Sequence, residues 1–217
     1  MKQGLTNNQL KIIAMITMTL DHIGLFMPQY PVLRILGRLA FPIFAYMIAE
    51  GCAHTRNIWR YLGSVALMAA LCQVVQYVTT GSVYMGILVT FSLSILLIAL
   101  IKDGYKFSVW IALIGVFLIS TVPILGTDFQ VDYGFVGVLT PVAVYLMKNK
   151  WGKAAACAVM LCALGLSYGT TQWYALLAVP LLLAYNGQRG KLKLKNLFYW
   201  YYPAHIAVIY AIFSFLQ

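Results

Sequence analysis

The chain has 217 residues, of which 62% are apolar and only 9% are charged, and its mean hydropathy is +0.84. Soluble domains carry about 25% charged residues, so this composition excludes an ordinary soluble protein. The net charge is +10, but the basic residues lie in short segments between apolar runs, which argues against a nucleic-acid-binding surface.

Apolar runs recur down the whole chain and predict an all-α, polytopic integral membrane protein with nine transmembrane helices. Several runs are shorter than 20 residues, and we expect these to tilt, to re-enter, or to extend into loops. The first run contains Asp21 and lacks a small-residue cleavage site, so we expect it to be retained as a span. The expected segments are 10–27, 32–53, 58–78, 84–101, 107–124, 132–147, 154–168, 172–185 and 197–216.

The basic residues predict how these segments cross the membrane. If all nine are spans, the 15 Lys and Arg residues, except Arg34 and Arg38, fall on one side of the membrane. Because cytoplasmic loops are enriched in Lys and Arg, this alternation predicts a cytoplasmic N-terminus and an external C-terminus. No inverted repeat or linker is visible, so we expect a single membrane domain over residues 1–217.

Seven ionisable residues gather in the first two segments. Such a residue inside a helical span costs roughly 2.5–3.5 kcal/mol on insertion scales, so it usually indicates a site. The seven residues are Lys11, Asp21, His22, Arg34, Arg38, Glu50 and His54.

Neither a disulfide framework nor a metal site is indicated by the sequence, because the four cysteines lie inside apolar runs and form no Cys-x-x-Cys pair.

The outer members of this group predict an ion pair beside a free histidine. Asp21 and His22 are neighbours on a helix and point about 100° apart, whereas Arg34 and Arg38 are four residues apart and share a face. We expect Asp21 to pair with an arginine and His22 to be free to exchange a proton. A purely structural Asp–Arg clamp is the alternative, and it leaves one arginine and His22 unexplained.

Glu50 and His54 share a helix face near the cytoplasmic end of the second segment, as either a structural or a functional pair. Pro42 is expected to kink the helix between this pair and the two arginines. Asp132, at the outer end of the sixth segment, is a further candidate partner for an arginine.

Two later stretches add candidates. His205 lies at mid-depth in the last segment, behind an aromatic stretch that includes Tyr202, where it could face the same cavity as His22. The last loop contains Asn186 and Arg189 in a glycine-punctuated turn with open backbone donors and further basic residues nearby. Anionic lipid headgroups or a phosphate-bearing cofactor would both explain this loop.

The chain resembles the TraX family, which is named for the N-acetylase of conjugative pilin. The resemblance covers nearly the whole sequence and is densest over residues 10–62. It is carried by KIIAMITMTLDHIG, LRILGRLAFPIFAYMIAEGCAHTRNIWRYL, VDYGFVGVL, LLLAYNGQRG and FYWYYPAHI.

A looser similarity extends to the acyltransferase-three superfamily, in which a basic residue precedes a functional histidine with ten residues between them and a pair of arginines follows. Here Lys11 precedes His22 with ten residues between them, and Arg34 and Arg38 follow. Lysine stands where arginine is usual, and the arginines are four apart rather than three.

The resemblance implies a bacterial inner-membrane enzyme that transfers an acetyl group from acetyl-CoA, without a metal, to an amine of a membrane-associated or exported peptide. His22 would be the general base, Arg34 or Arg38 would stabilise the oxyanion, and Asp21 would orient one of them. The residues expected to bind acetyl-CoA are Lys11, Glu50, His54, Arg56, Arg60, Asn186 and Arg189. Those expected to contact the acceptor are Asp132, Tyr202 and His205.

Two other classes of function fit the same residues. A proton-coupled carrier would use Asp21, Glu50 and the histidines as a relay, and a membrane chaperone for a small exported peptide would need no catalysis. The acceptor, N- as against O-acylation, the acyl length and the oligomeric state stay open. Direct transfer and transfer through an acetyl-His22 intermediate are both open as well.

Overall fold

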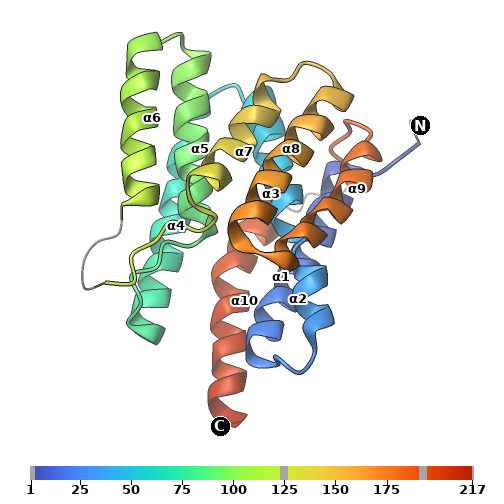
Figure 1. Cartoon of the computed structure of the whole chain (residues 1–217), viewed down its shortest axis with the longest axis vertical. Helices are drawn as coiled ribbons and strands as arrows, with labels where there is room; N and C mark the ends of the chain where they lie inside the picture. The colour runs from blue at the N-terminus through green and yellow to red at the C-terminus, as the bar shows by residue number, and fades with distance from the viewer. Residues whose placement is uncertain (1–2, 123–126, 191–194, 217) are drawn as a thin grey trace. The chain divides into compact units, whose positions relative to one another are not determined.

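The computed structural model describes residues 3–122, 127–190 and 195–216, and these ranges fold into helices joined by turns (Figure 1). Within them there is no strand, and two isolated bridges pair Leu5 with Tyr185 and Met85 with Val131. The all-α prediction is therefore confirmed. The helices are α1 (Asn7–Phe26), α2 (Pro31–Gly37), α3 (Ala40–His54), α4 (Ile58–Thr80), α5 (Ile87–Lys102), α6 (Lys106–Thr121), α7 (Gly134–Leu146), α8 (Lys150–Tyr168), the 3-10 helix η1 (Thr170–Ala178), α9 (Val179–Leu183) and α10 (Lys195–Leu216).

Each of the nine predicted segments contains a helix, but the second is divided into α2 and α3. A turn at Arg38 and Leu39 separates the two helices. Pro42 in the first turn of α3 accounts for the break, because a proline ring clashes with the carbonyl of the residue four positions earlier. That residue is Arg38. The predicted kink is thus present as a two-residue interruption of the helix, which ends α2 next to the second arginine.

The eighth predicted segment is also divided, into η1 and α9. Gly169 ends α8 with a φ of +88°, a conformation that favours glycine, and Pro180 stands at the start of α9. Trp173 packs so closely on α8 that a Cβ added to Gly165 would lie 2.7 Å from its indole ring. This contact fixes η1 against α8 and determines where the neighbouring Gln172 lies.

The helices form two compact units, one of residues 1–47 with 149–217 and one of residues 48–148. In the first unit, α1 packs against α2 and α10, while η1 packs against α2, α8 and α9. In the second unit, α5 packs against α4, α6 and α7. The first unit therefore holds Asp21, His22 and the two arginines.

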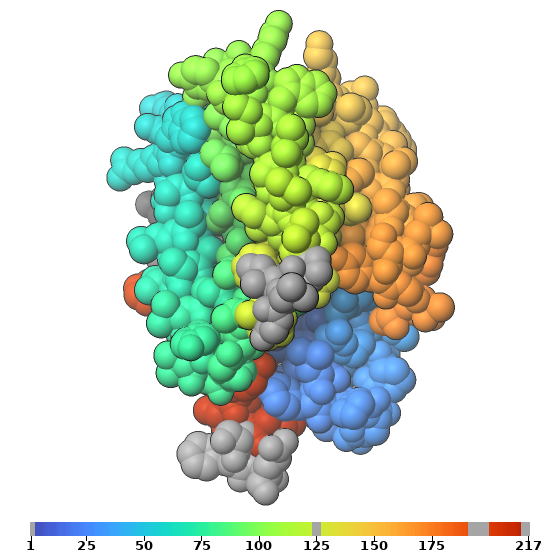
Figure 2. Space-filling view, turned by 60° about the vertical axis from the view of Figure 1, so that its left-hand side comes forward, coloured from blue at the N-terminus to red at the C-terminus, as the bar shows by residue number. Residues whose placement is uncertain are grey.

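Helix length and surface composition indicate a membrane protein. Within the described chain, α1, α2 with α3, α4 and α8 are long and apolar enough to cross a bilayer. In the second unit, large apolar side chains cover exposed parts of α4 and α6, and α6 faces the viewer in light green in Figure 2. Exposed apolar surface on this scale is typical of contact with lipid. The exposed residues include Leu67, Leu71, Val74 and Val78 on α4 and Phe107, Trp110, Ile111, Ile114 and Phe117 on α6.

Lys102 stabilises the end of α3 within the second unit. Its ammonium group donates hydrogen bonds to the backbone carbonyls of Cys52 and Thr55, each at 3.2 Å. These carbonyls belong to the last turn of α3 and the residue after it, where carbonyl groups lack helical partners and a cation is favourable. The next residue, Asp103, lies in the turn between α5 and α6, and its Oδ2 accepts a hydrogen bond from Trp59 Nε1 at 2.8 Å.

We expect Lys102→Met to lower the free energy of unfolding by about 1 kcal/mol, because the α3 carbonyls lose a charged donor. Lys106→Met is the matched control, since it removes the same charge from the first residue of the neighbouring helix α6. Thermal unfolding in detergent micelles measures both. Equal midpoints for the two variants would contradict this role of Lys102.

Candidate functional site

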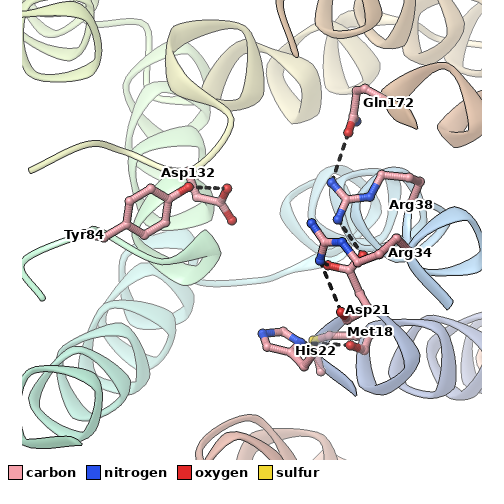
Figure 3. A network of polar contacts seen from close by, with 8 residues as sticks. All are labelled: Met18, Asp21, His22, Arg34, Arg38, Tyr84, Asp132 and Gln172. Atoms are coloured by element: carbon pink, nitrogen blue, oxygen red, sulfur yellow. Dashed lines mark hydrogen bonds and ion pairs between the residues drawn. The ribbon is translucent and has the colours of Figure 1, made fainter. Parts of the chain in front are cut away.

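The carboxylate of Asp21 binds both arginines of the second segment (Figure 3). Its Oδ2 accepts a hydrogen bond from Arg34 Nη1 at 2.7 Å, and its Oδ1 accepts one from Arg38 Nη2 at 2.5 Å. Arg34 Nη1 also donates to the backbone carbonyl of Asp21 at 3.1 Å. The exposed fractions of the three side chains lie between 13% and 31%, so the ion pairs are largely shielded from water. The predicted ion pair is confirmed, and it includes both arginines.

Glycine permits this approach of α1 and α2. A Cβ added to Gly37 would lie 2.2 Å from Asp21 Oδ1 and 2.4 Å from its Cβ, so a side chain there would displace the carboxylate. At Gly24 of α1, an added Cβ would lie 3.0 Å from Arg34 Cδ and from Leu33 Cβ. The two helices therefore meet closely enough for one short carboxylate to reach arginines a full turn apart.

His22 takes no part in these ion pairs. Its ring points away from the arginines in Figure 3, and its Nδ1 lies 2.8 Å from the backbone carbonyl of Met18. A carbonyl oxygen can only accept a hydrogen bond, so Nδ1 carries the hydrogen and the neutral ring has its lone pair on Nε2. The side chains of Asp21 and His22 thus point in different directions from adjacent positions, as the helical spacing predicts.

His205 of α10 lies against His22. The two ring centroids are 5.0 Å apart and the rings meet at 86°. His205 also stacks on Tyr201, with centroids 5.2 Å apart and planes 4° apart, and meets the edge of Tyr202 at 5.9 Å. The Tyr201 hydroxyl makes a short hydrogen bond with Thr19, which joins α10 to α1.

Gln172 is a member of the site that the sequence did not reveal. Its Oε1 accepts a 3.2 Å hydrogen bond from Arg38 Nη1, on the other side of the guanidinium from Asp21 (Figure 3). The side chain is only 3% exposed, and its Nε2 has no hydrogen-bond partner in the described part of the chain. An uncharged residue at the first position of the predicted segment 172–185 gave no signal, and only the packing of η1 places it here.

Among the residues predicted to bind acetyl-CoA, Lys11 and Arg189 come together in the first unit. The last loop is joined to the start of α1 by the Leu5–Tyr185 bridge and by hydrogen bonds from the amides of Asn7 and Asn8. These amides donate to the carbonyls of Gln188 and Arg189, at 2.8 and 3.2 Å. Lys11 follows one turn later in α1 and is half-buried.

The prediction of open backbone donors in this loop is wrong at two of its residues. The Asn186 amide donates to the carbonyl of Leu5, and the Gln188 amide donates to Asn186 Oδ1, each at 2.9 Å. The side-chain amide of Asn186 also donates to the carbonyl of Gly4 at 3.1 Å. Asn186 therefore holds the loop onto the N-terminal segment through its backbone and side-chain amides, while its Oδ1 accepts the Gln188 amide within the turn.

The other residues predicted to bind acetyl-CoA lie in the second unit. Glu50 is 7% exposed, and its carboxylate is 3.8 Å from Nδ1 of His54, whose side chain is 74% exposed. The same Nδ1 lies 2.8 Å from the Glu50 carbonyl. Arg56 and Arg60 are exposed around the start of α4, where Asn57 caps the helix through the amide of Arg60.

Asp132 lies before α7 in the second unit. Its Oδ1 accepts a 2.8 Å hydrogen bond from the Tyr84 hydroxyl, and its carbonyl accepts one from Thr90 at 2.7 Å. Tyr133, which follows, has a left-handed φ of +57°, a conformation that is costly for a bulky residue. Tyr84 is thus one partner of this carboxylate.

Comparison with known proteins identifies the family of the chain. The family model described as TraX protein matches residues 6–213. The chain belongs to the TraX family. The resemblance seen in the sequence is thereby confirmed.

The TraX chain is 28% identical to a probable fimbrial assembly protein, FimC of serogroup H1, from Dichelobacter nodosus, with 96% of each chain covered. It is also 49% identical over 47 residues to an uncharacterised protein of Rickettsia prowazekii (strain Madrid E), covering 20% of this chain and 19% of that one. No solved structure matches.

We expect Asp21→Asn to lower the free energy of unfolding by ~2–4 kcal/mol, because two largely buried guanidinium groups lose their shared counter-charge. Asp103→Asn is the control, since it removes one carboxylate from an exposed turn. Chemical denaturation in micelles measures both. Similar small changes in the two variants would show that the arginines do not depend on Asp21.

Proposed function

We propose that this TraX protein is a membrane-embedded acetyltransferase that moves an acetyl group from acetyl-CoA to an amine of a membrane-associated or exported peptide. The observation that carries the proposal is that a histidine in a fixed tautomer, His22, directly follows the aspartate that holds the two arginines. Family membership adds support, because the family is named for an acetylase of pilin.

His22 is the general base in this proposal. Its Nδ1 is engaged by the Met18 carbonyl at 2.8 Å, so Nε2 is the atom that accepts the proton as the amine attacks the thioester carbon. The C–N bond forms, the carbonyl π electrons move to oxygen, and the C–S bond then breaks. The departing thiolate takes the proton from the His22 imidazolium, which restores the neutral ring.

The arginine network supplies positive charge for the oxyanion. One carboxylate shared by two guanidinium groups leaves the cluster a net charge of +1. Asp21 and Gln172 bind the Arg38 guanidinium on opposite sides and hold its orientation before the reaction begins. A cation that is held in place and shielded from water stabilises developing negative charge better than a hydrated one.

The donor would bind at the cytoplasmic side of a nine-span topology with the N-terminus inside. Lys11 and Arg189 are close enough, through the loop bonded to the start of α1, to contact one phosphate group of acetyl-CoA together. Lys11 precedes His22 by 11 residues, or about 16 Å along a helix, a distance that the pantetheine arm would cross. Arg56, Arg60, Glu50 and His54 lie in the second unit, and their part in binding acetyl-CoA stays a prediction.

The acceptor is proposed to be a subunit of a surface filament, with Tyr202 of the first unit among the residues that contact it. The contact predicted for Asp132, in the second unit, stays a prediction. The FimC relative, whose name refers to fimbrial assembly, supports this class of acceptor. The same name favours one alternative, a non-catalytic assembly role. That role requires neither acetyl-CoA nor the His22 Nε2 lone pair.

We expect His22→Gln to lower the rate of acetyl transfer 10²–10⁴-fold, because glutamine cannot accept the proton, while acetyl-CoA binding stays within about two-fold. The assay follows free CoA thiol with purified protein, acetyl-CoA and a short apolar peptide with a free amino terminus. Ile16→Ala, on the exposed side of the same helix, is the control and should keep full activity. Full activity of His22→Gln would overturn the mechanism.

A further inference from the structure

His205 is buried and has an unused lone pair. The residue is 7% exposed, and its Nδ1 lies 2.9 Å from the carbonyl of Tyr201, four residues earlier. As at His22, the carbonyl fixes the hydrogen on Nδ1 and leaves the lone pair on Nε2. No hydrogen-bond partner for Nε2 lies within the described ranges. A buried acceptor without a donor is unfavourable, which points to a ligand that supplies the donor.

The two histidines therefore present matching acceptors from two helices. His22 on α1 and His205 on α10 are fixed in the same tautomer, each by its own i−4 carbonyl. Their ring centroids are 5.0 Å apart. Rings at this distance and angle touch edge to face, so a shared ligand lies beside their contact and not between them. One atom with two hydrogen bonds of ~3 Å reaches acceptors up to about 6 Å apart, which makes a single nitrogen the smallest group that serves both Nε2 atoms.

We propose that His205 selects an amine over a hydroxyl as the acetyl acceptor. This inference rests on the proposed acetyl transfer. A neutral primary amine has two N–H groups and one lone pair. One N–H donates to His22 Nε2 and is the proton transferred in the reaction, while the other donates to His205 Nε2. With both hydrogens held, the nitrogen lone pair is directed at the thioester carbon.

A hydroxyl acceptor cannot satisfy this arrangement, because it has a single O–H. If that hydrogen goes to His22, the Nε2 of His205 stays buried without a donor. Sites that hydrogen-bond a substrate N–H reject analogues that lack it for this reason. His205 would thus be a specificity-determining residue that also orients the amine.

The surroundings of His205 hold its ring in this position. Tyr201 stacks against one face of the His205 ring, and its hydroxyl is hydrogen-bonded to Thr19 on α1. Tyr202 lies edge-on to the His205 ring, and Phe44 of α3 lies edge-on to Tyr202. Tyr201 and Tyr202 are on α10 with His205, and their own contacts join α10 to α1 and α3. A change in the orientation of the His205 ring would therefore disturb several contacts. An aromatic replacement is therefore the substitution that best preserves the packing.

The test uses two peptide probes that differ in one group: an apolar peptide with a free amino terminus, and the same peptide with an α-hydroxyl in its place. We expect His205→Phe to lower kcat/KM for the amine at least ~10-fold, the effect of losing one buried hydrogen bond, and to leave the hydroxyl probe nearly unchanged. The amine-to-hydroxyl ratio falls accordingly. His205→Gln, which keeps an acceptor oxygen, should retain part of the ratio, and Val208→Ala on the exposed side of α10 should retain all of it.

Equal losses for both probes would overturn the inference, because a residue needed only for packing affects both alike. No loss for either probe would overturn it as well. If the wild-type protein acetylates the amine but His205→Phe keeps the same ratio, the inference fails and the proposed function stands. If the wild-type protein transfers acetyl to neither probe, the proposed function fails and the inference fails with it.

Discussion

The shared carboxylate of Asp21 is the constraint on which the candidate site depends. It binds both arginines at 2.7 and 2.5 Å and joins α1 to α2, which requires a glycine at position 37. Two guanidinium groups in a membrane protein would otherwise repel each other at a high desolvation cost. With the carboxylate in place, the cluster keeps one positive charge in a fixed position, beside a histidine that remains outside the ion pairs.

Most of the helical architecture could be predicted from apolar run length, because a span needs about 20 consecutive apolar residues. The proline at position 42 also indicated where the second segment breaks. The 3-10 conformation of η1 could not be predicted, since it depends on the packing of Trp173 against Gly165. The nine-span topology, its orientation and the single membrane domain over residues 1–217 stay predictions, supported by the distribution of basic residues.

The site was predicted best where helical spacing alone determines in which direction a side chain points. The separation of Asp21 from His22 and the common face of the arginines followed from about 100° per residue. Contacts between distant segments were harder to predict. His205 was expected to face the same cavity as His22, and the two rings are in contact, whereas nothing in the sequence indicated that Gln172 would bind Arg38. The donors of the last loop were misjudged, because the N-terminal segment that satisfies Asn186 is far away in sequence.

The most direct test of acetyl transfer uses the wild-type protein in lipid vesicles with acetyl-CoA that carries an isotope in the acetyl group. A peptide with a free amino terminus is added, and both products are measured by mass spectrometry. We expect labelled N-acetyl peptide and free CoA thiol in equal amounts, formed at a rate proportional to the amount of protein. Peptide that binds or crosses the membrane without gaining the label would contradict it.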